Sequence, residues 1–483
     1  AIPSGATGYE IGHSVRFEKG SNPSLTRTPS SEGNRKTWTY SVWCKRGNVG
    51  VNTYLLGSNG RYGTFLYFSG ADRLGFNSSY ADVGRGIEST ALYRDPNAWM
   101  HIVAVFNTTE STGADRMKLY VNGSRLTDLS WNTPHYIPQN QDGMGMNMTT
   151  LQEISGGGRY ASTVRWDGYM AEIHFIDGVA KTPSDFGETG DYGEWKPIEY
   201  TGSYGSQGFY LDFADSGNLG DDESGNGGDF AENNIAASDQ MVDSPTNNFC
   251  TINPIDEYGI GTLSEGNLKS AHANVDKIGF STFAMTSGKW YWEAQIVTQG
   301  VRGGIGIASK ADRDGWTPRG GSNVYAILFC YDGEVDTSAT DNGNSSTASD
   351  GSIYSFAFDA DNGSFWVAHN SAINISSTAQ ATGLPSKTWH MFEENSTTGT
   401  KSTHFYNFGQ DSSFAGTKTA QGNQDANGIG DFTYTPPTGY LALCTSNLPD
   451  VAVVPSENFN TLLYSGNSST NAITGVGFQP DFT

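Results

Sequence analysis

The stretch FYLDFADSGNLGDDESGNGGDF, residues 209–230, lies near the middle of the chain and divides it into two similar parts. Phe209, Leu211 and Phe213 alternate with Tyr, Asp and Ala, which is the period-two pattern of a half-buried strand. From residue 215 to residue 229 almost every residue is Asp, Asn, Ser, Glu or Gly, and such a run cannot form a hydrophobic core. We therefore interpret the stretch as a strand that ends in a loop, at the seam between two β-sandwiches.

Two interpretations of this acidic loop stay open. Short acidic side chains can hold turns by accepting hydrogen bonds from their own backbone, or they can surround a Ca²⁺ ion with oxygen atoms. The spacing is not that of the EF-hand calcium loop, because the distal Glu is absent. Calcium is the cofactor to consider, and its candidate ligands are Asp212, Asp215, Asn218, Asp221 and Asp222.

Length and composition predict an all-β protein. The 483 residues are enough for about two to three domains. The chain contains 61 glycines and 12% aromatic residues, and this mixture is typical of short strands joined by Gly and Asn turns. No stretch shows a sustained helical period. No apolar run approaches the ~20 residues needed to cross a bilayer, and the first residues lack the features of a signal peptide, so we expect no membrane insertion.

The charge of the chain excludes one class of partner. It carries 28 basic and 51 acidic residues, for a net charge of −23, and no basic cluster offsets this. Such a surface repels phosphate backbones, so we expect no nucleic-acid binding. The four cysteines are far apart and form no CxxC motif, so we expect buried free thiols rather than disulfides or a metal site; they are Cys44, Cys250, Cys330 and Cys444.

Residues 1–205 form the first predicted domain. Its strands contain paired aromatic residues at Trp38 and Trp43, followed by WMHIVAVF at 99–106, KLYVNG at 118–123 and WDGYMAEIHFIDG at 166–178. In this order the pieces resemble the laminin-G and concanavalin A-like jelly-roll family. The resemblance implies a β-sandwich but no particular activity, since the fold hosts lectins, hydrolases and inert spacers.

After a seam at 206–253, residues 254–450 form the second predicted domain. Its strands resemble a SPRY domain, another β-sandwich; the resemblance is carried by SGKWYWEAQI at 287–296, GGIGIA at 303–308, DADNGSFWVAHN at 359–370 and FYNFGQ at 405–410. SPRY domains bind protein or peptide partners through loops at one end and have no catalytic residues. Residues 451–483 are rich in Pro, Ser, Asn and Gly, and we expect a linker or the start of a further segment.

A glycosidase interpretation can be tested on one strand. Jelly-roll glycosidases place carboxylates on alternate positions of one strand, where they act as nucleophile and acid. Here strand parity puts Glu172, His174 and Ile176 on one face, so two of the three acids are missing from it. We expect no enzymatic activity and no catalytic residue, and we expect the histidines within strands, such as His101, to be structural.

Aromatic residues in polar, turn-rich segments are the candidates for glycan stacking, because their rings offer flat apolar faces. Core or interface packing is the alternative for each of them. The candidates are Trp131, Tyr136, Tyr160 and Trp316.

Two lectin-like sandwiches in one acidic chain resemble the fibre and appendage proteins of tailed bacteriophages. The resemblance implies a non-enzymatic structural and adhesion protein on the virion surface. Its expected partners are other virion structural proteins, a host surface glycan or protein, and further copies of itself in a trimer. The alternatives are a decoration or spacer protein without a host ligand, a glycoside hydrolase of the concanavalin A-like fold, and a secreted bacterial adhesin.

Overall fold

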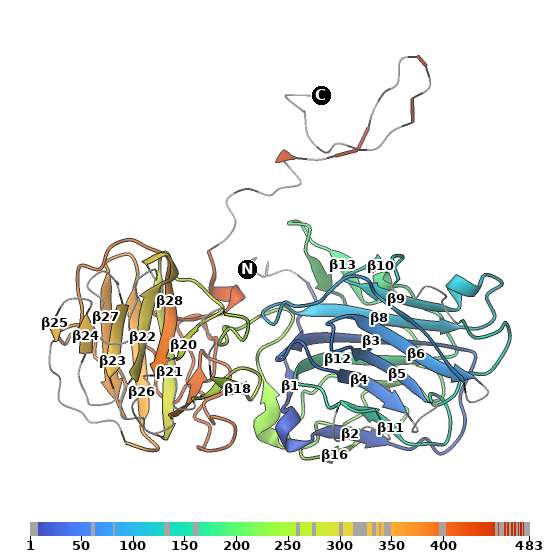
Figure 1. Cartoon of the computed structure of the whole chain (residues 1–483), viewed down its shortest axis with the longest axis horizontal. Helices are drawn as coiled ribbons and strands as arrows, with labels where there is room; N and C mark the ends of the chain where they lie inside the picture. The colour runs from blue at the N-terminus through green and yellow to red at the C-terminus, as the bar shows by residue number, and fades with distance from the viewer. Residues whose placement is uncertain are drawn as a thin grey trace.

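A computed structural model shows two β-sandwiches side by side (Figure 1). It describes residues 8–58, 63–80, 83–129, 136–157, 164–256, 261–272, 277–298, 303–312, 326–330, 335–337, 340–341, 349–395 and 402–449, with scattered positions after 452. The helices among these residues are short turns, such as η5 (Pro183–Asp185), and none has the length and apolar character needed to span a membrane. The predicted all-β class is confirmed.

The first sandwich has two antiparallel sheets that pack face to face. The first sheet has the order β10 (Ser124–Arg125), β9 (Met117–Val121), β8 (Met100–Asn107), β3 (Thr37–Arg46), β12 (Gly168–Asp177), β1 (Ser14–Phe17), β17 (Gln240–Met241), and β15 (Phe209–Leu211) also pairs with β12. The second sheet has the order β16 (Ala231–Asn233), β2 (Ser24–Arg27), β11 (Gln152–Ile154), β4 (Thr53–Ser58), β5 (Thr64–Phe68), β6 (Leu74–Tyr80), β7 (Val83–Glu88). A small hairpin of β13 (Gly187–Thr189) and β14 (Trp195–Pro197) stands beside them.

Large aromatic side chains join the two sheets of the first sandwich. Trp38 on β3 stacks on Phe106 of β8 at 5.2 Å between ring centroids, and its edge meets Phe76 of the opposite sheet at 5.6 Å. Each such buried side chain contributes about 1.5–3 kcal/mol relative to exposure. The alternating strand pattern of the sequence is the origin of this core, because it sends every second side chain inward.

The acidic seam belongs structurally to the first sandwich. The strand predicted at Phe209 is β15, which pairs with β12. Farther along, β16 adds to the edge of the second sheet at β2, and β17 adds to the first sheet at β1. The segment between the sandwiches therefore supplies strands to both sheets of the first one.

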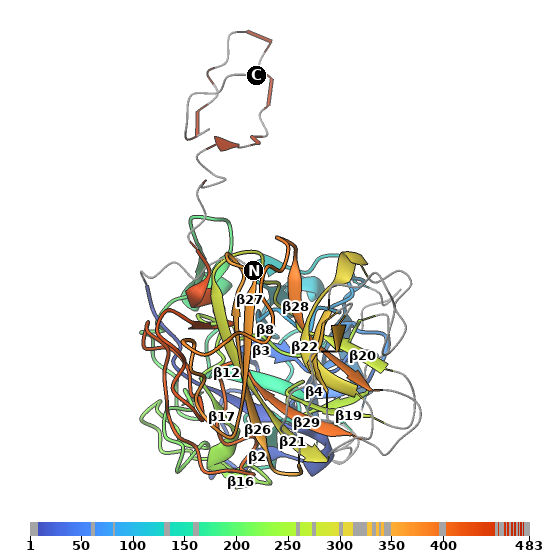
Figure 2. The same cartoon turned by 90° about the vertical axis from the view of Figure 1, so that its left-hand side faces the viewer.

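The second sandwich repeats the two-layer plan (Figure 2). One sheet has the order β18 (Thr262–Ser264), β19 (Lys269–Ala271), β29 (Thr403–Asn407), β21 (Lys289–Thr298), β26 (Ile353–Asp359), β27 (Ser364–His369), and β30 (Leu441–Ala442) pairs in parallel with β21. The other has the order β20 (Lys277–Phe280), β28 (Trp389–Asn395), β22 (Gly303–Ser309), β23 (Ala326–Cys330), β24 (Val335–Thr337), β25 (Thr340–Asp341).

The core of the second sandwich is also aromatic. Trp292 on β21 stacks on Phe356 of β26 at 5.4 Å, and Trp389 on β28 meets Phe358 edge to face at 5.9 Å. Three of the four cysteines are buried free thiols as expected, namely Cys44, Cys250 and Cys444. The side chain of Cys330 lies outside the described residues.

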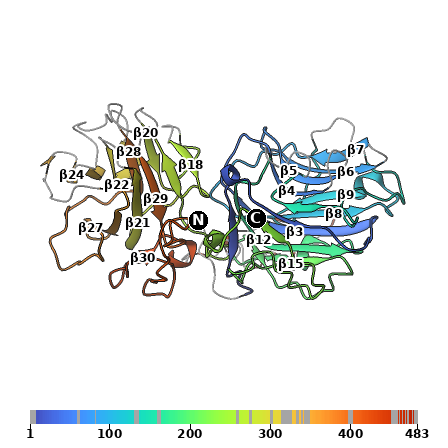
Figure 3. The same ribbon diagram turned by 90° about the horizontal axis from the view of Figure 1, so that it is seen from below.

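Seen from below, the two sandwiches lie side by side, with β18 of the second on the side that faces the first (Figure 3). Buried polar contacts join the two sandwiches. Arg16 on β1 is 1% exposed and lies 3.0 Å from a carboxylate oxygen of Asp411 and 3.5 Å from Glu265, both in the second sandwich. Asp239 of the seam lies 3.2 Å from the same guanidinium. The Tyr169 hydroxyl donates to the carbonyl oxygen of Gly266 at 2.8 Å. These contacts fix one sandwich against the other.

Candidate functional site: a cleft between the sandwiches

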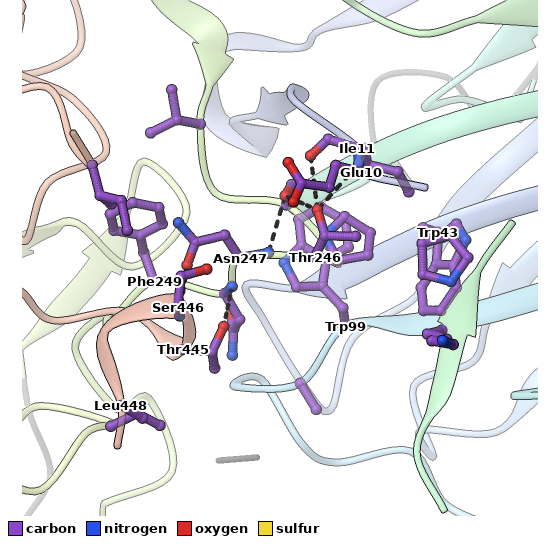
Figure 4. Close-up of a pocket in the computed structure, with 18 of the residues that line it drawn as sticks. Glu10, Ile11, Trp43, Trp99, Thr246, Asn247, Phe249, Thr445, Ser446 and Leu448 are labelled. Atoms are coloured by element: carbon purple, nitrogen blue, oxygen red, sulfur yellow. Dashed lines mark hydrogen bonds between the residues drawn. The ribbon is translucent and has the colours of Figure 1, made fainter. Parts of the chain in front are cut away.

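A cleft of about 1170 Å³ lies between the two sandwiches, and side chains from both line it (Figure 4). The first sandwich contributes the segment before β1, the loop before β8, and β14. The seam contributes residues 242 and 244–249, and the second sandwich contributes 282–284 and positions between 424 and 448. The cleft is therefore formed by segments that are distant in the sequence.

Trp195 on β14 forms an aromatic wall of the cleft together with Trp43 on β3. The ring of His101 lies between them, with centroids 6.2 Å from Trp195 and 4.8 Å from Trp43, and both pairs are stacked. Trp195 Nε1–H donates to His101 Nδ1 at 3.0 Å, so the proton of neutral His101 is on Nε2 and is donated to Ser41 Oγ at 2.7 Å. Burial lowers the pKa of His101 to about 3, which keeps this ring neutral. The half-buried ring of Trp195 is thus held in a fixed orientation.

The floor of the cleft is rigid because a buried ion pair lies beneath it. Lys45 Nζ lies 2.7 Å from a carboxylate oxygen of Asp243, and both side chains are at most 1% exposed. The other oxygen of Asp243 accepts the indole N–H of Trp99 at 2.9 Å. Lys45 also donates to Asn248 Oδ1 at 2.7 Å, and the Asn248 side chain donates to the carbonyl oxygen of Asn97. The positions of the aromatic and amide groups that face the cleft are therefore set before any ligand binds.

The rim of the cleft carries an excess of negative charge. Its acidic residues are Glu10, Asp95 and Glu194, and its basic residue among the described lining is Lys196. The ammonium group of Lys196 lies 3.2 Å from Glu188, so part of its charge is already neutralised. An anionic ligand would meet repulsion here, whereas neutral hydroxyl-rich groups would find carboxylate oxygens that accept hydrogen bonds.

Behind Tyr9, at the edge of the cleft, lies a hydrogen-bonded network on the outer face of β12. The hydroxyls of Tyr9 and Tyr210 donate to Glu172 Oε1 at 2.9 and 2.7 Å. His174 Nε2 lies 3.1 Å from Glu172 Oε2, and His174 Nδ1 lies 3.0 Å from the Tyr204 hydroxyl. Burial and the charge of Glu172 raise the pKa of Tyr9 and of Tyr210, so both phenols stay protonated and continue to donate.

A β-bulge creates this arrangement. The register between β12 and β3 shifts between Ala171 and His174, and Glu172 takes a positive φ of 48°. The predicted face is confirmed, since Ile173 and Phe175 lie in the core of the first sandwich while Glu172 and His174 point away from it. Both oxygens of Glu172 are occupied by hydrogen-bond partners, and Glu172 does not line the cleft.

The predicted calcium ligands make local turns. Asp212 Oδ1 accepts the N–H of Ala214 at 2.9 Å, and Asp215 Oδ1 accepts that of Gly217 at 2.8 Å. Asp222 is 7% exposed and accepts three backbone N–H groups, from residues 210, 224 and 228. The backbone N–H of Asn218 donates to the carbonyl oxygen of Asp215, and that of Asp221 donates to the carbonyl oxygen of Asn218. These contacts are those of the turn interpretation, and calcium binding stays an untested prediction.

Of the four predicted stacking residues the structure describes only Tyr136, which does not line the cleft. Tyr136 is half-buried, packs against the core of the first sandwich, and has a raised pKa because of that burial. Trp131, Tyr160 and Trp316 lie outside the described residues. The aromatic residue that the prediction missed is Trp195, although its surroundings, DYGEWKP at 191–197, have the same polar and turn-rich character.

Comparisons with known proteins agree with the architecture. Residues 19–185 match the family model described as the concanavalin A-like lectin/glucanases superfamily. This match begins before β2 and ends after β12, so it covers most of the first sandwich. No curated protein sequence matches the chain.

Several solved structures are similar at low identity. The mouse laminin α1 chain domains LG4-5 are 11% identical with a TM-score of 0.29, over 80% of this chain and 84% of the laminin chain. The SPRY domain of human HERC1 is 12% identical with a TM-score of 0.25, over 29% of this chain and 87% of that domain. A heptameric SAP-like pentraxin from Limulus polyphemus is 15% identical with a TM-score of 0.27, over 36% of this chain and 80% of its own. The family match at 19–185, together with two face-to-face antiparallel sheets, shows that the first sandwich has the concanavalin A-like fold.

Proposed function

We propose that this protein is a non-enzymatic adhesion module that binds a neutral surface glycan in the cleft between its two sandwiches. The observation that carries the proposal is the half-buried ring of Trp195, which is stacked on His101 and lines a cleft of about 1170 Å³. Sugar rings have apolar faces that pack on such indole surfaces, while their hydroxyls need polar partners at the edge. Both kinds of group meet in this cleft.

The charges of the rim support a neutral ligand over an anionic one. Glu10, Asp95 and Glu194 face the cleft against Lys196, within a chain of net charge −23. A sialylated, sulfated or phosphorylated glycan would approach against this field, and the repulsion would be strongest at low ionic strength. We expect neutral and amino sugars to be the ligand class.

The proposal includes no hydrolysis. A glycosidase needs a pair of carboxyl groups on opposite sides of the scissile bond. In this protein Glu172 is committed to Tyr9, Tyr210 and His174, and it lies outside the lining of the cleft.

The narrower part of the proposal is the place of the protein in a virus particle. We propose a bacteriophage fibre or appendage, assembled as a trimer with other virion proteins, in which the cleft contacts the host surface. This part rests on the resemblance of the combined laminin-G-like and SPRY-like sequence patterns to such proteins. Electron microscopy of particles labelled with an antibody to this chain tests it, because a particle without label would exclude a virion role.

Glycan binding is tested by replacing Trp195. We expect Trp195→Ala to weaken binding of the best neutral oligosaccharide on a glycan array at least about tenfold, or ~1.4 kcal/mol, because the stacking surface is removed. Trp366→Ala is the matched control: Trp366 is also half-buried, but it lies on β27, and its indole N–H donates to Ser377 O at 3.2 Å. Equal binding by wild type and Trp195→Ala in isothermal titration would refute the cleft as the binding site.

The absence of hydrolysis is tested on the same array sugars and on a panel of β-glucans. We expect no reducing ends to be released by the wild-type protein. Turnover that disappears in Glu172→Gln would show that the chain is a glycoside hydrolase after all.

A further inference from the structure

Three buried side chains with metal-binding atoms meet in the second sandwich. His272 directly follows β19 and His404 lies on β29, both in one sheet, whereas Glu393 lies on β28 of the facing sheet. Their ligand atoms lie within 4.8 Å of one another, and all three side chains are at most 1% exposed. Across the part of the chain that the structure describes, no other group of His, Cys, Asp or Glu side chains meets in this way.

One carboxylate oxygen of this group is crowded with partners. Glu393 Oε2 accepts hydrogen bonds from Ser270 Oγ at 2.6 Å and from the Tyr406 hydroxyl, and His404 Nδ1 lies 3.2 Å from it. Glu393 Oε1, in contrast, has no hydrogen-bond partner among the described residues. If the carboxylate only accepted hydrogen bonds, its donors could be shared between the two oxygens. The gathering of all of them at Oε2 therefore indicates that this oxygen has a second role.

His272 points to that role. Its Nε2 lies 3.2 Å from Glu393 Oε2, but the contact lacks hydrogen-bond geometry. Within the described residues neither ring nitrogen of His272 has a hydrogen-bond partner, although the ring is buried. A buried polar group left in this state costs about 1–3 kcal/mol. A cation that accepts the lone pair of Nε2 beside the oxygen would remove the part of this cost that belongs to Nε2.

The separations of the two histidine nitrogens from the carboxylate oxygen fit a tetrahedral ion. Zinc bonds of about 2.0–2.1 Å at tetrahedral angles place neighbouring donor atoms about 3.3 Å apart. The two distances between histidine nitrogens and Glu393 Oε2 are both 3.2 Å. Imidazole nitrogens also suit zinc, whereas calcium and magnesium require shells made mostly of oxygen atoms.

We propose that His272, Glu393 and His404 bind one Zn²⁺ ion through Nε2, Oε2 and Nδ1, respectively. The Tyr406 hydroxyl donates to Glu393 Oε2 and lies 3.3 Å from His404 Nδ1, so it borders the site and leaves the fourth position to water. The Ser270 hydroxyl holds the carboxylate in its orientation, as partners of metal ligands commonly do. The ion would join the two sheets of the second sandwich and is independent of glycan binding in the cleft.

The burial of the site makes the role structural. With all three ligand side chains inside the sandwich, the ion is taken up while the sheets come together, and its binding free energy adds to the stability of the fold. We therefore expect zinc to affect refolding and melting temperature rather than the affinity for glycans.

The full chain, produced in zinc-supplemented medium and exchanged into chelator-free buffer, tests the proposal by elemental analysis. We expect about one zinc per chain, and its loss to below about a tenth in His272→Gln and in His404→Gln. His390→Gln is the matched control, because His390 shares β28 with Glu393 but is not part of the group, and it should keep its zinc.

A second measurement decides the case if the variants fail to fold. Wild-type protein is unfolded with EDTA and refolded with zinc, with cobalt or with neither metal. We expect a melting temperature several degrees higher with zinc, and the visible absorption of tetrahedral Co²⁺ with cobalt. Wild-type protein that recovers the same spectrum and melting temperature in all three conditions, or zinc that persists in both histidine variants, would show that these residues form a hydrogen-bonded ion pair and no metal site.

Discussion

At the scale of single residues, Asp72 shows how one buried carboxylate organises the connection between β5 and β6. It accepts the N–H of Gly50 at 2.6 Å, and its oxygens lie 2.9 Å from Arg94 Nε and 3.1 Å from Arg46 Nη2. Burial alone would raise the pKa of Asp72, but the hydrogen bonds from Gly50 and Arg94 and the charge of Arg46 outweigh burial and hold the pKa below its ordinary value of 3.8. The ionised form is therefore the one that the fold prefers.

This preference predicts a specific dependence of stability on pH. Because the pKa of Asp72 is lower in the folded than in the unfolded state, its contribution is complete above the unfolded value of 3.8 and is lost as the pH falls through the folded value. We expect Asp72→Asn to lower the free energy of unfolding by about 1–3 kcal/mol at neutral pH, and by less at acidic pH. Urea denaturation of both proteins from pH 7 to the acid limit measures the difference, and a difference independent of pH would contradict the assignment.

At the scale of elements, the turn between β9 and β10 determines where the aromatic wall of the cleft can lie. Asn122 and Gly123 both have positive φ, of 46° and 78°, as the two-residue hairpin turn requires. A Cβ atom on Gly123 would lie 2.5 Å from the ring of Trp195. The glycine therefore serves two purposes, since it closes the hairpin and leaves space for the indole.

The two purposes can be separated with a matched pair of variants. Gly123→Ala and Gly225→Ala introduce the same methyl group at φ values of 78° and 82°, but Gly225 has no atom within 4 Å of the new Cβ. We expect Gly225→Ala to lower the free energy of unfolding by about 1–2 kcal/mol, because a side chain is strained at positive φ. We expect Gly123→Ala to lower it by a further ~1–3 kcal/mol, because the new methyl group collides with Trp195. The same variant should weaken glycan binding, because the Trp195 ring has to move. Thermal melts and glycan titrations of both variants measure these effects. Equal losses of stability and affinity in the two variants would mean that the Trp195 ring moves aside without cost.

At the scale of the whole molecule, Arg16 joins the two sandwiches. It is enclosed by Asp239, Glu265 and Asp411, of which the last two belong to the second sandwich. Burial alone would lower the pKa of Arg16, but the three carboxylates outweigh burial and raise the pKa above its ordinary value. Removing one partner from a buried charge group usually leaves the others uncompensated.

We expect Arg16→Met to destabilise the protein by about 3–5 kcal/mol and to split one calorimetric transition into two, because the sandwiches would then melt separately. Arg125→Met is the control, since its ion pair with Asp115 at 2.8 Å is more than 30% exposed on both sides and should contribute under about 1 kcal/mol. A single transition in Arg16→Met would show that other interface contacts are sufficient for the coupling.

The sequence predicted the elements better than it predicted the site, and the reason is the range of the interactions. Strand alternation is a local property, so β15 at Phe209, the outward face of β12 and the burial of Cys44 and Cys444 could all be derived from neighbouring residues. The cleft depends instead on contacts such as that between Ile11 and Thr246, which no local pattern reports. Its rim residue Trp195 had the right surroundings, but nothing in the sequence placed it opposite residues of the seam.

The pairing of β1 with β17 has a mechanical consequence for a protein that is pulled at both ends. Ser14 lies opposite Met241, and the backbone of Ile11 is bonded to the Thr246 hydroxyl at 3.1 Å in both directions. Tension applied at Ile11 and at Cys250 would pass directly from β1 to β17 and on into the second sandwich. It would not load the strands of the first sandwich that lie between β1 and β17 in the sequence. The short antiparallel pair would carry this force by peeling, one bond at a time, and would yield first. While this pair holds, the other strands of the first sandwich carry no tension; once it opens, the chain between β1 and β17 becomes the only path for the force, so the first sandwich is loaded second.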